Sequence, residues 1–215
     1  MYKIINIETW KRKNQYNFYK EYDNPYFNIC TELDISACFD FTNQHSISFF
    51  IASLFASTKA VNLVEELKYR IRKEEVVLHE IVHAGSTIIK NDETFGFCYF
   101  NYLESYNQFN ENAKKSLNDF KLKENNFDPQ DNRDNLIHYS ILPWISFSSI
   151  SHARNWKTNN SVPIITMGKY TKKGGKLMMP VSIEVHHSLV DGLHVSKYFN
   201  HFQEILNNPK LYLNN

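Results

Sequence analysis

The sequence predicts an α/β fold, a mixed β-sheet with flanking helices. Segments whose apolar residues recur at helical spacing alternate along the chain with segments rich in β-branched and aromatic residues. The chain has 215 residues, of which 42% are hydrophobic and 15% aromatic, which is enough for one domain with a substantial core. We therefore predict a single domain over residues 1–215.

Three elements are predicted in the first third of the chain. Residues 9–20 carry four aromatic side chains among polar ones, which indicates a short amphipathic helix capped by Thr9. Residues 26–35 have the composition of a strand. Residues 46–68 place apolar residues along one broad helical face, so we predict a helix there.

The rest of the chain continues the alternation. The β-branched and aromatic content predicts β-structure at 76–90 and 94–100, and strands at 162–171 and 176–187 joined by a turn at 172–175. Helices are predicted at 104–123 and at 191–207, where Asn207-Asn208-Pro209 ends the second. A polar loop is predicted at 123–133, directly after the first of these helices.

Composition argues against several classes of function. The formal net charge is +1, so no electrostatic case for nucleic acid or membrane binding follows. The longest apolar runs, such as 47–56, are too short to span a bilayer, and the N-terminus does not have the pattern of a signal peptide. Cys30, Cys38 and Cys98 have no metal-binding spacing, which favours reduced thiols in a cytoplasmic protein.

The strand predicted over 176–187 ends in two adjacent histidines. His187 has the same parity as the apolar residues of that strand, so we expect His187 rather than His186 to face the interior or an interface. Asp191 and Gly192 follow as a turn, and the last helix begins there. The positive end of that helix would keep His187 neutral, and a neutral imidazole can take a proton from a hydroxyl group that attacks a thioester. A structural histidine is the competing interpretation, so the prediction needs support elsewhere in the chain.

That support is a resemblance to a known family. His186 to Val195 read HHSLVDGLHV, which resembles the HHxxxDGxH signature of the chloramphenicol acetyltransferases, and the wider superfamily of CoA-dependent acyltransferases shares its HxxxDG core. Three further segments resemble motifs of this family in the same order: WKRKNQYNFY at 10–19, SILPW at 140–144 and PIITMGKY at 163–170. The resemblance covers nearly the whole chain and implies the CoA-dependent acyltransferase fold.

The resemblance implies catalytic roles for five residues. His187 is the general base that accepts the proton of the acceptor hydroxyl. Ser140 hydrogen-bonds the oxyanion of the tetrahedral intermediate, and Thr166 holds a water near that intermediate. Arg12 and Asp191 match a buried ion pair that supports the histidine loop, as expected of a carboxylate that needs a two-pronged partner.

The same resemblance implies the substrates and the assembly. Acetyl-CoA is expected as co-substrate, with no permanently bound cofactor and no metal, and chloramphenicol is expected as the acceptor, which would inactivate the antibiotic. Tyr19 and Phe27 are assigned to the acceptor pocket, and Trp144, Lys169 and Tyr170 to the CoA site. The family implies a homotrimer with active sites at subunit interfaces, in which the histidine faces a neighbour's acceptor pocket.

The acceptor side departs from the family pattern. The chain has His138-Tyr139-Ser140 where the family has Asn-[Ile/Val]-Ser, and the stretches at 67–71 and 88–95 also differ. Pocket contacts are typically worth about 1–3 kcal/mol each in discrimination between substrates. An O-acetyltransferase of the same mechanism with another hydroxylated acceptor is therefore the main alternative. A catalytically inactive drug-binding protein is a further alternative, against which the intact set of catalytic residues argues.

A competing motif lies at His79-Glu80-Ile81-Val82-His83, a literal HExxH. This zinc metalloprotease signature requires a helix that puts both histidines on one face. The flanking residues favour β-structure instead, in which positions four residues apart are separated by about 13 Å. We expect no zinc site here.

Overall fold

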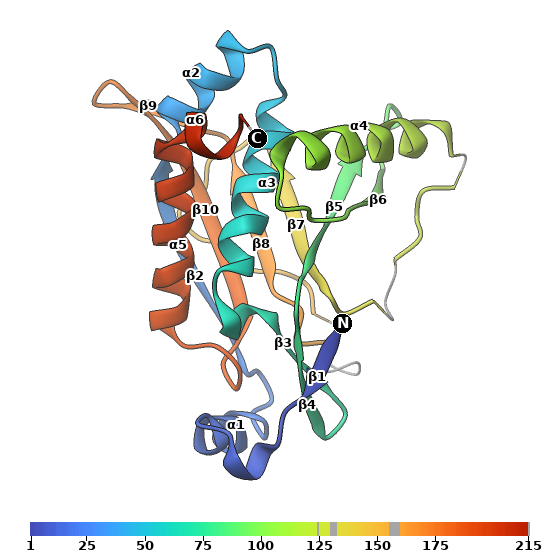
Figure 1. Cartoon of the computed structure of the whole chain (residues 1–215), viewed down its shortest axis with the longest axis vertical. Coiled ribbons are helices and arrows are strands. Elements are labelled where there is room, and N and C mark those ends of the chain that lie inside the picture. The colour runs from blue at the N-terminus through green and yellow to red at the C-terminus, as the bar shows by residue number, and fades with distance from the viewer. Residues whose placement is uncertain (124, 130–132, 155–159, 215) are drawn as a thin grey trace.

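The computed structural model describes residues 1–123, 125–129, 133–154 and 160–214. Its strands, in chain order, are β1 (Tyr2–Ile4), β2 (Tyr26–Asp34), β3 (Tyr69–Arg72), β4 (Glu75–His79), β5 (His83–Ile89), β6 (Phe95–Phe100), β7 (Leu136–Leu142), β8 (Ile164–Gly168), β9 (Thr171–Lys173) and β10 (Lys176–His186). Seven of them form one sheet in the order β2-β10-β8-β7-β5-β6, with β9 paired to β10 (Figure 1). The strands β1, β4 and β3 form a second, smaller sheet.

Helices cover one face of the large sheet, and the arrangement confirms the predicted mixed α/β fold. They are η1 (Ile7–Thr9), α1 (Lys13–Tyr19), α2 (Ser36–Gln44), α3 (Phe49–Asn62), η2 (Glu65–Lys68), α4 (Tyr106–Leu122), α5 (Gly192–Asn207) and α6 (Pro209–Tyr212). The periodic segments predicted as β2, β6, α4 and α5 are confirmed to within two residues. The elements β1, α2, β3, β7 and α6 were not predicted, and the strand predicted over 162–171 ends at Gly168, with β9 beginning at Thr171. Within the described residues, no helix is long and apolar enough to cross a membrane.

Two predicted helices begin later than expected, each for a local reason. Thr9 ends the short helix η1, in which the Asn6 side chain accepts a hydrogen bond from the Glu8 N–H at 3.1 Å; the helix α1 begins only at Lys13. At the second helix, Ser46 has a φ of 53°, which an α-helix does not tolerate. The helix α3 therefore starts after Ser48, whose hydroxyl caps it, and ends at Asn62 instead of residue 68.

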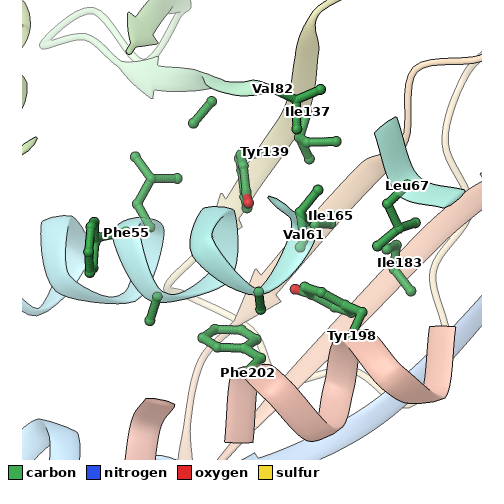
Figure 2. Packing of buried hydrophobic residues seen from close by; sticks show 14 of the residues in the cluster. Phe55, Val61, Leu67, Val82, Ile137, Tyr139, Ile165, Ile183, Tyr198 and Phe202 are labelled. Atoms are coloured by element: carbon green, nitrogen blue, oxygen red, sulfur yellow. The ribbon is translucent and has the colours of Figure 1, made fainter. Parts of the chain in front are cut away.

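One face of the large sheet packs against α3 and α5 and forms the core. Figure 2 shows Tyr139 on one side of α3 and Tyr198 of α5 on the other. Both phenol groups hydrogen-bond Ser57 Oγ, at 3.0 Å and 2.8 Å, so a small buried hydroxyl cluster ties the sheet to both helices. In β10 the residues Val181 and Ile183, with no exposed surface, face this core.

The opposite face of the sheet carries a row of small, mostly polar side chains. Ser140 of β7 pairs with Thr166 of β8, Thr166 pairs with Ser182 of β10, and Ser182 pairs with Cys30 of β2. Paired residues on neighbouring strands point to the same face, so these four side chains form one row across the sheet, which we call the polar row. Neither Thr166 nor Ser182 has any exposed surface.

Candidate active site

The turn that carries His187 lies where β10 ends and α5 begins. The last pair of the β10·β2 ladder is His186 with Tyr26, and the His187 N–H donates to the Pro25 carbonyl at 2.8 Å. The turn then closes on itself through N–H groups that donate to the His186 carbonyl. Asp191 is the N-cap of α5, so the predicted succession of strand, turn and helix N-terminus is confirmed.

The His187 ring lies between two aromatic side chains. Tyr19 of α1 stacks on it at 3.9 Å between centroids and 8° between planes, and Phe27 of β2 lies 4.5 Å away. The side chain of His187 is 30% exposed, although its Nδ1 atom is buried and has no hydrogen-bond partner among the described residues. The accessible part of the ring therefore lies away from Nδ1, on the side that includes Nε2.

The expectation that His187 rather than His186 is buried in the interior is wrong for the single chain, and an interface position for His187 stays a prediction. His186 is only 2% exposed, its ring meets Tyr26 edge-on at 5.0 Å, and burial lowers the pKa of His186 to about 4. The reason is that β10 ends at His186, so the alternation of its side chains does not extend to His187. His186 is a structural residue, and His187 projects from the turn.

Arg12 joins the N-terminal segment to this turn. Its guanidinium donates two parallel hydrogen bonds to Asp191, Nη1 to Oδ2 and Nη2 to Oδ1, the second at 2.9 Å. Nη2 also donates to the His187 carbonyl at 3.4 Å. These hydrogen bonds to Arg12 hold the pKa of Asp191 below its usual value. The predicted ion pair is present, but only Arg12, at 5% exposure, is buried; the Asp191 side chain is 35% exposed.

This asymmetry predicts unequal costs for breaking the pair. Asp191→Ala would leave the buried Arg12 cation without its partner, which typically costs about 3 kcal/mol or more. Arg12→Leu would leave a carboxylate that water can reach, so we expect roughly half that loss or less. Denaturant unfolding of both variants measures the difference. Equal losses, or a smaller loss for Asp191→Ala, would contradict the described burial.

A second group of predicted residues lies on the polar row. Ser140 and the residues around it line a cavity of about 800 Å³ on the helix-free face of the sheet. Thr166 Oγ1 lies 3.0 Å from Nε2 of His152, and burial lowers the pKa of His152. The resemblance assigns a water to Thr166, and the imidazole of His152 lies within hydrogen-bonding distance of the same hydroxyl.

The walls of this cavity include His138, noted above as a departure from the family pattern, and two groups that the sequence did not indicate. His138 lies on β7 two residues before Ser140, and Arg154 follows His152 on the loop after β7. Arg154 donates to Glu184 of β10 at 2.6 Å, and both side chains are at least nine-tenths buried. Phe95 and Phe97 of β6 supply an apolar wall. The loop that carries His152 and Arg154 has no periodicity, so no sequence signal identified them.

The residues assigned to CoA cluster at one end of the sheet. Trp144 follows β7 and is 62% exposed, and Tyr170, 37% exposed, follows β8. The Lys169 N–H donates to the Ile145 carbonyl at 2.8 Å, which holds these two chain segments together. Because β7 and β8 are parallel, all three residues lie at the carboxyl ends of the strands that carry Ser140 and Thr166.

The structure does not bring His187 and Ser140 together within one chain. Thr166 pairs with Ser182, four residues before His186 on β10. At a rise of about 3.3 Å per residue, Ser182 in the polar row lies roughly 13 Å from the histidine end of β10, and Ser140 lies two strands away from β10, beyond β8. His187 is not among the residues that line the Ser140 cavity. Two groups that act on the same reacting atoms must each come within about 3 Å of them, so His187 and Ser140 of one chain are too far apart to do so.

The HExxH segment is strand and turn, as its composition predicts. β4 ends at His79 and β5 begins at His83. His79 Nε2 lies 3.0 Å from Asp134 Oδ1, and His83 Nδ1 accepts the Tyr102 N–H at 3.0 Å. Among the described residues, no group of three or more His, Cys, Asp or Glu side chains could hold a metal ion.

Comparison with known proteins assigns this chain to one family. A family model described as chloramphenicol acetyltransferase matches residues 1–203. The chain is 28% identical to chloramphenicol acetyltransferase 3 of Escherichia coli over 96% of its length and 97% of the relative. It is also 28% identical to a chloramphenicol acetyltransferase of Staphylococcus aureus, over 95% of this chain and 96% of that one.

Comparison with solved structures finds the same family. A chloramphenicol acetyltransferase superposes with a TM-score of 0.90 at 28% identity, covering 96% of this chain and all of the other. The dihydrolipoamide acetyltransferase of Azotobacter vinelandii superposes at 0.67 with 13% identity, covering 94% of this chain and 88% of that one. The second likeness extends to the fold alone.

Proposed function

The chain belongs to the chloramphenicol acetyltransferase family, and we propose that it transfers the acetyl group of acetyl-CoA to a hydroxyl group of chloramphenicol, with His187 as general base. One observation carries the assignment of the base: a partly exposed imidazole is held between Tyr19 and Phe27, with the Arg12–Asp191 pair behind it. Asp191 Oδ1 lies 3.5 Å from Nδ1 of His187. A carboxylate at that side favours the tautomer with hydrogen on Nδ1, which leaves the lone pair on the accessible Nε2.

The reaction then follows from these groups. Nε2 of His187 takes the hydroxyl proton as the acceptor oxygen attacks the thioester carbonyl, and a new C–O bond forms. The Ser140 hydroxyl donates a hydrogen bond to the resulting oxyanion. The intermediate collapses, the C–S bond breaks, and the CoA thiolate takes the proton back from the imidazolium. Trp144, Lys169 and Tyr170 would hold CoA near the end of the sheet where Ser140 lies.

In this proposal a second copy of the chain completes the site. His187 and Ser140 lie too far apart in one chain to act on the same carbon, which supports the homotrimer that the family implies. In that assembly His187 of one subunit would face the Ser140 cavity of the next. Tyr19 and Phe27, which contact His187, would meet the acceptor from the histidine side.

Subunit mixing tests this shared site. His187→Ala and Ser140→Ala are each expected to be nearly inactive as pure proteins. When they are co-expressed in equal amounts under different tags, about a quarter of the sites in random trimers would combine an intact His187 with an intact Ser140, so activity returns. A mixture of His187→Ala with the double variant contains no complete site and serves as control. Doubly tagged trimers without recovered activity would rule out the shared site.

The polar wall of the cavity favours a second candidate acceptor. His138, His152 and the Arg154–Glu184 pair put hydrogen-bonding groups beside Ser140. A pocket that hydrogen-bonds its substrate discriminates strongly against a molecule that leaves those groups unpaired. The second candidate is therefore the same acetyl transfer to a more polar hydroxylated acceptor.

The deciding experiment is a thiol-release assay. Purified protein is incubated with acetyl-CoA and either chloramphenicol or a panel of polyhydroxylated aromatic acceptors, and CoA release is followed. Turnover of chloramphenicol with the highest kcat/KM supports the first candidate. A larger kcat/KM for a polar acceptor, reversed by His152→Leu, supports the second. If none of these acceptors causes release of CoA, both candidate functions are contradicted.

A further inference from the structure

The third histidine of the HHxxxDGxH motif, His194, hydrogen-bonds the turn that carries His187. His194 is the third residue of α5 and is 8% exposed, and its Nδ1 accepts the backbone N–H of Asp191 at 2.9 Å. Helices often satisfy the N–H of their N-cap residue with a Glu or Gln oxygen three residues later. Here an imidazole nitrogen does so. An accepting Nδ1 requires that the hydrogen of the neutral ring be on Nε2.

A buried carboxylate faces that hydrogen. Oε1 of Glu66, in η2, lies 3.4 Å from Nε2 of His194, and Glu66 is 7% exposed. Burial opposes the charge of Glu66, but a hydrogen bond from its own backbone N–H and the nearby His194, Lys11 and Lys197 outweigh it and lower the pKa of Glu66. Glu66 therefore stays an acceptor and selects the Nε2–H form of His194.

Two consecutive residues of the N-terminal segment join this pair to the catalytic turn. Lys11 Nζ lies 3.5 Å from Oε1 of Glu66, and Arg12 binds both the Asp191 carboxylate and the His187 carbonyl. The backbone of Asp191 is thus held by His194 while its carboxylate is held by Arg12. The charged groups that face His194 are Glu66, Asp191, Arg12 and Lys197.

We infer that His194 is a positioning residue: its Nδ1 fixes the backbone of Asp191, and through Asp191 it sets the place of the His187 ring. This inference rests on the proposed role of His187. The carboxylate that faces Nδ1 of His187 belongs to the residue whose N–H is bound by His194. Misplacement of a catalytic group by about 1 Å can cost on the order of 10²-fold in rate.

Three variants test the inference. His194→Leu removes the acceptor at nearly constant volume and is expected to lower kcat about 10- to 100-fold with the KM for acetyl-CoA nearly unchanged. His194→Gln presents an oxygen to Asp191 and an amide N–H to Glu66, so kcat is expected to recover to within about 3-fold of wild type. His201→Leu, a partly exposed histidine on the same helix, is the matched control.

Separate outcomes identify which proposal fails. Wild-type kcat in a folded His194→Leu protein, with His187→Ala still inactive, overturns the positioning role alone. If the His187→Ala variant is active, the proposed role of His187 as general base is overturned, and the inference that rests on it falls as well. If His194→Leu does not fold, ¹⁵N NMR of histidine-labelled wild-type protein decides: we expect a neutral His194 with hydrogen on Nε2 at pH 7. A hydrogen on Nδ1 of that ring would overturn the inference.

Discussion

His187→Ala is expected to lower kcat by about 10²- to 10⁴-fold, the usual contribution of a general base. The physical reason is that the acceptor hydroxyl would have to lose its proton to water while it attacks the thioester. The side chain is 30% exposed, stacks on Tyr19 and contacts Phe27, so its removal should leave the subunit folded. Steady-state rates with acetyl-CoA, together with melting curves, measure both effects.

The neighbouring histidine is the matched control. His186 is 2% exposed, packs against Tyr26 and accepts the Ser188 N–H on Nδ1 at 3.3 Å. His186→Ala should therefore destabilise the subunit much more than His187→Ala does. Near-normal kcat in the His187 variant would remove that residue from the mechanism.

Ser140→Ala is expected to lower kcat by about 10²- to 10³-fold, as loss of one oxyanion donor usually does. The bond to the oxyanion forms chiefly in the transition state, so the KM values for both substrates should stay nearly constant. Initial rates over a matrix of acetyl-CoA and acceptor concentrations separate the two parameters. Ser149→Ala, at an exposed serine after β7, should behave like wild type. A change confined to KM would instead make Ser140 a binding residue.

Local patterns in the sequence predicted most of the large elements. The helices α4 and α5 and the strands β2 and β6 have strong periodicity or composition, and their positions are close to those predicted. The strand β7 was missed because the hydrophobic pattern of its sequence is weak. It is an inner strand, and its two faces have different surroundings. Tyr139 faces the helix-packed core, and Ser140 faces the cavity. Tertiary context, which local pattern does not encode, defined this strand.

The candidate site was predictable in its motif residues and not in its environment. The motifs identified His187, Arg12 and Asp191, and the structure brings these three together. Parity could not predict the burial of His187, because it assumes that the strand continues past His186. His152 reaches Thr166 from an aperiodic loop, and a contact of that kind between loop and sheet has no sequence signature.

The distance between His187 and the polar row has a thermodynamic consequence for the proposed assembly. A substrate that touches His187 of one subunit and Ser140 of the next is bound only by associated chains. By mass action, acetyl-CoA and the acceptor would then stabilise the assembly in proportion to RT ln(1 + [L]/Kd), about 2.7 kcal/mol at a hundredfold excess over Kd. Dilution of the free protein would in turn lower the turnover per chain. The substrates of such an enzyme also act as ligands of its quaternary structure.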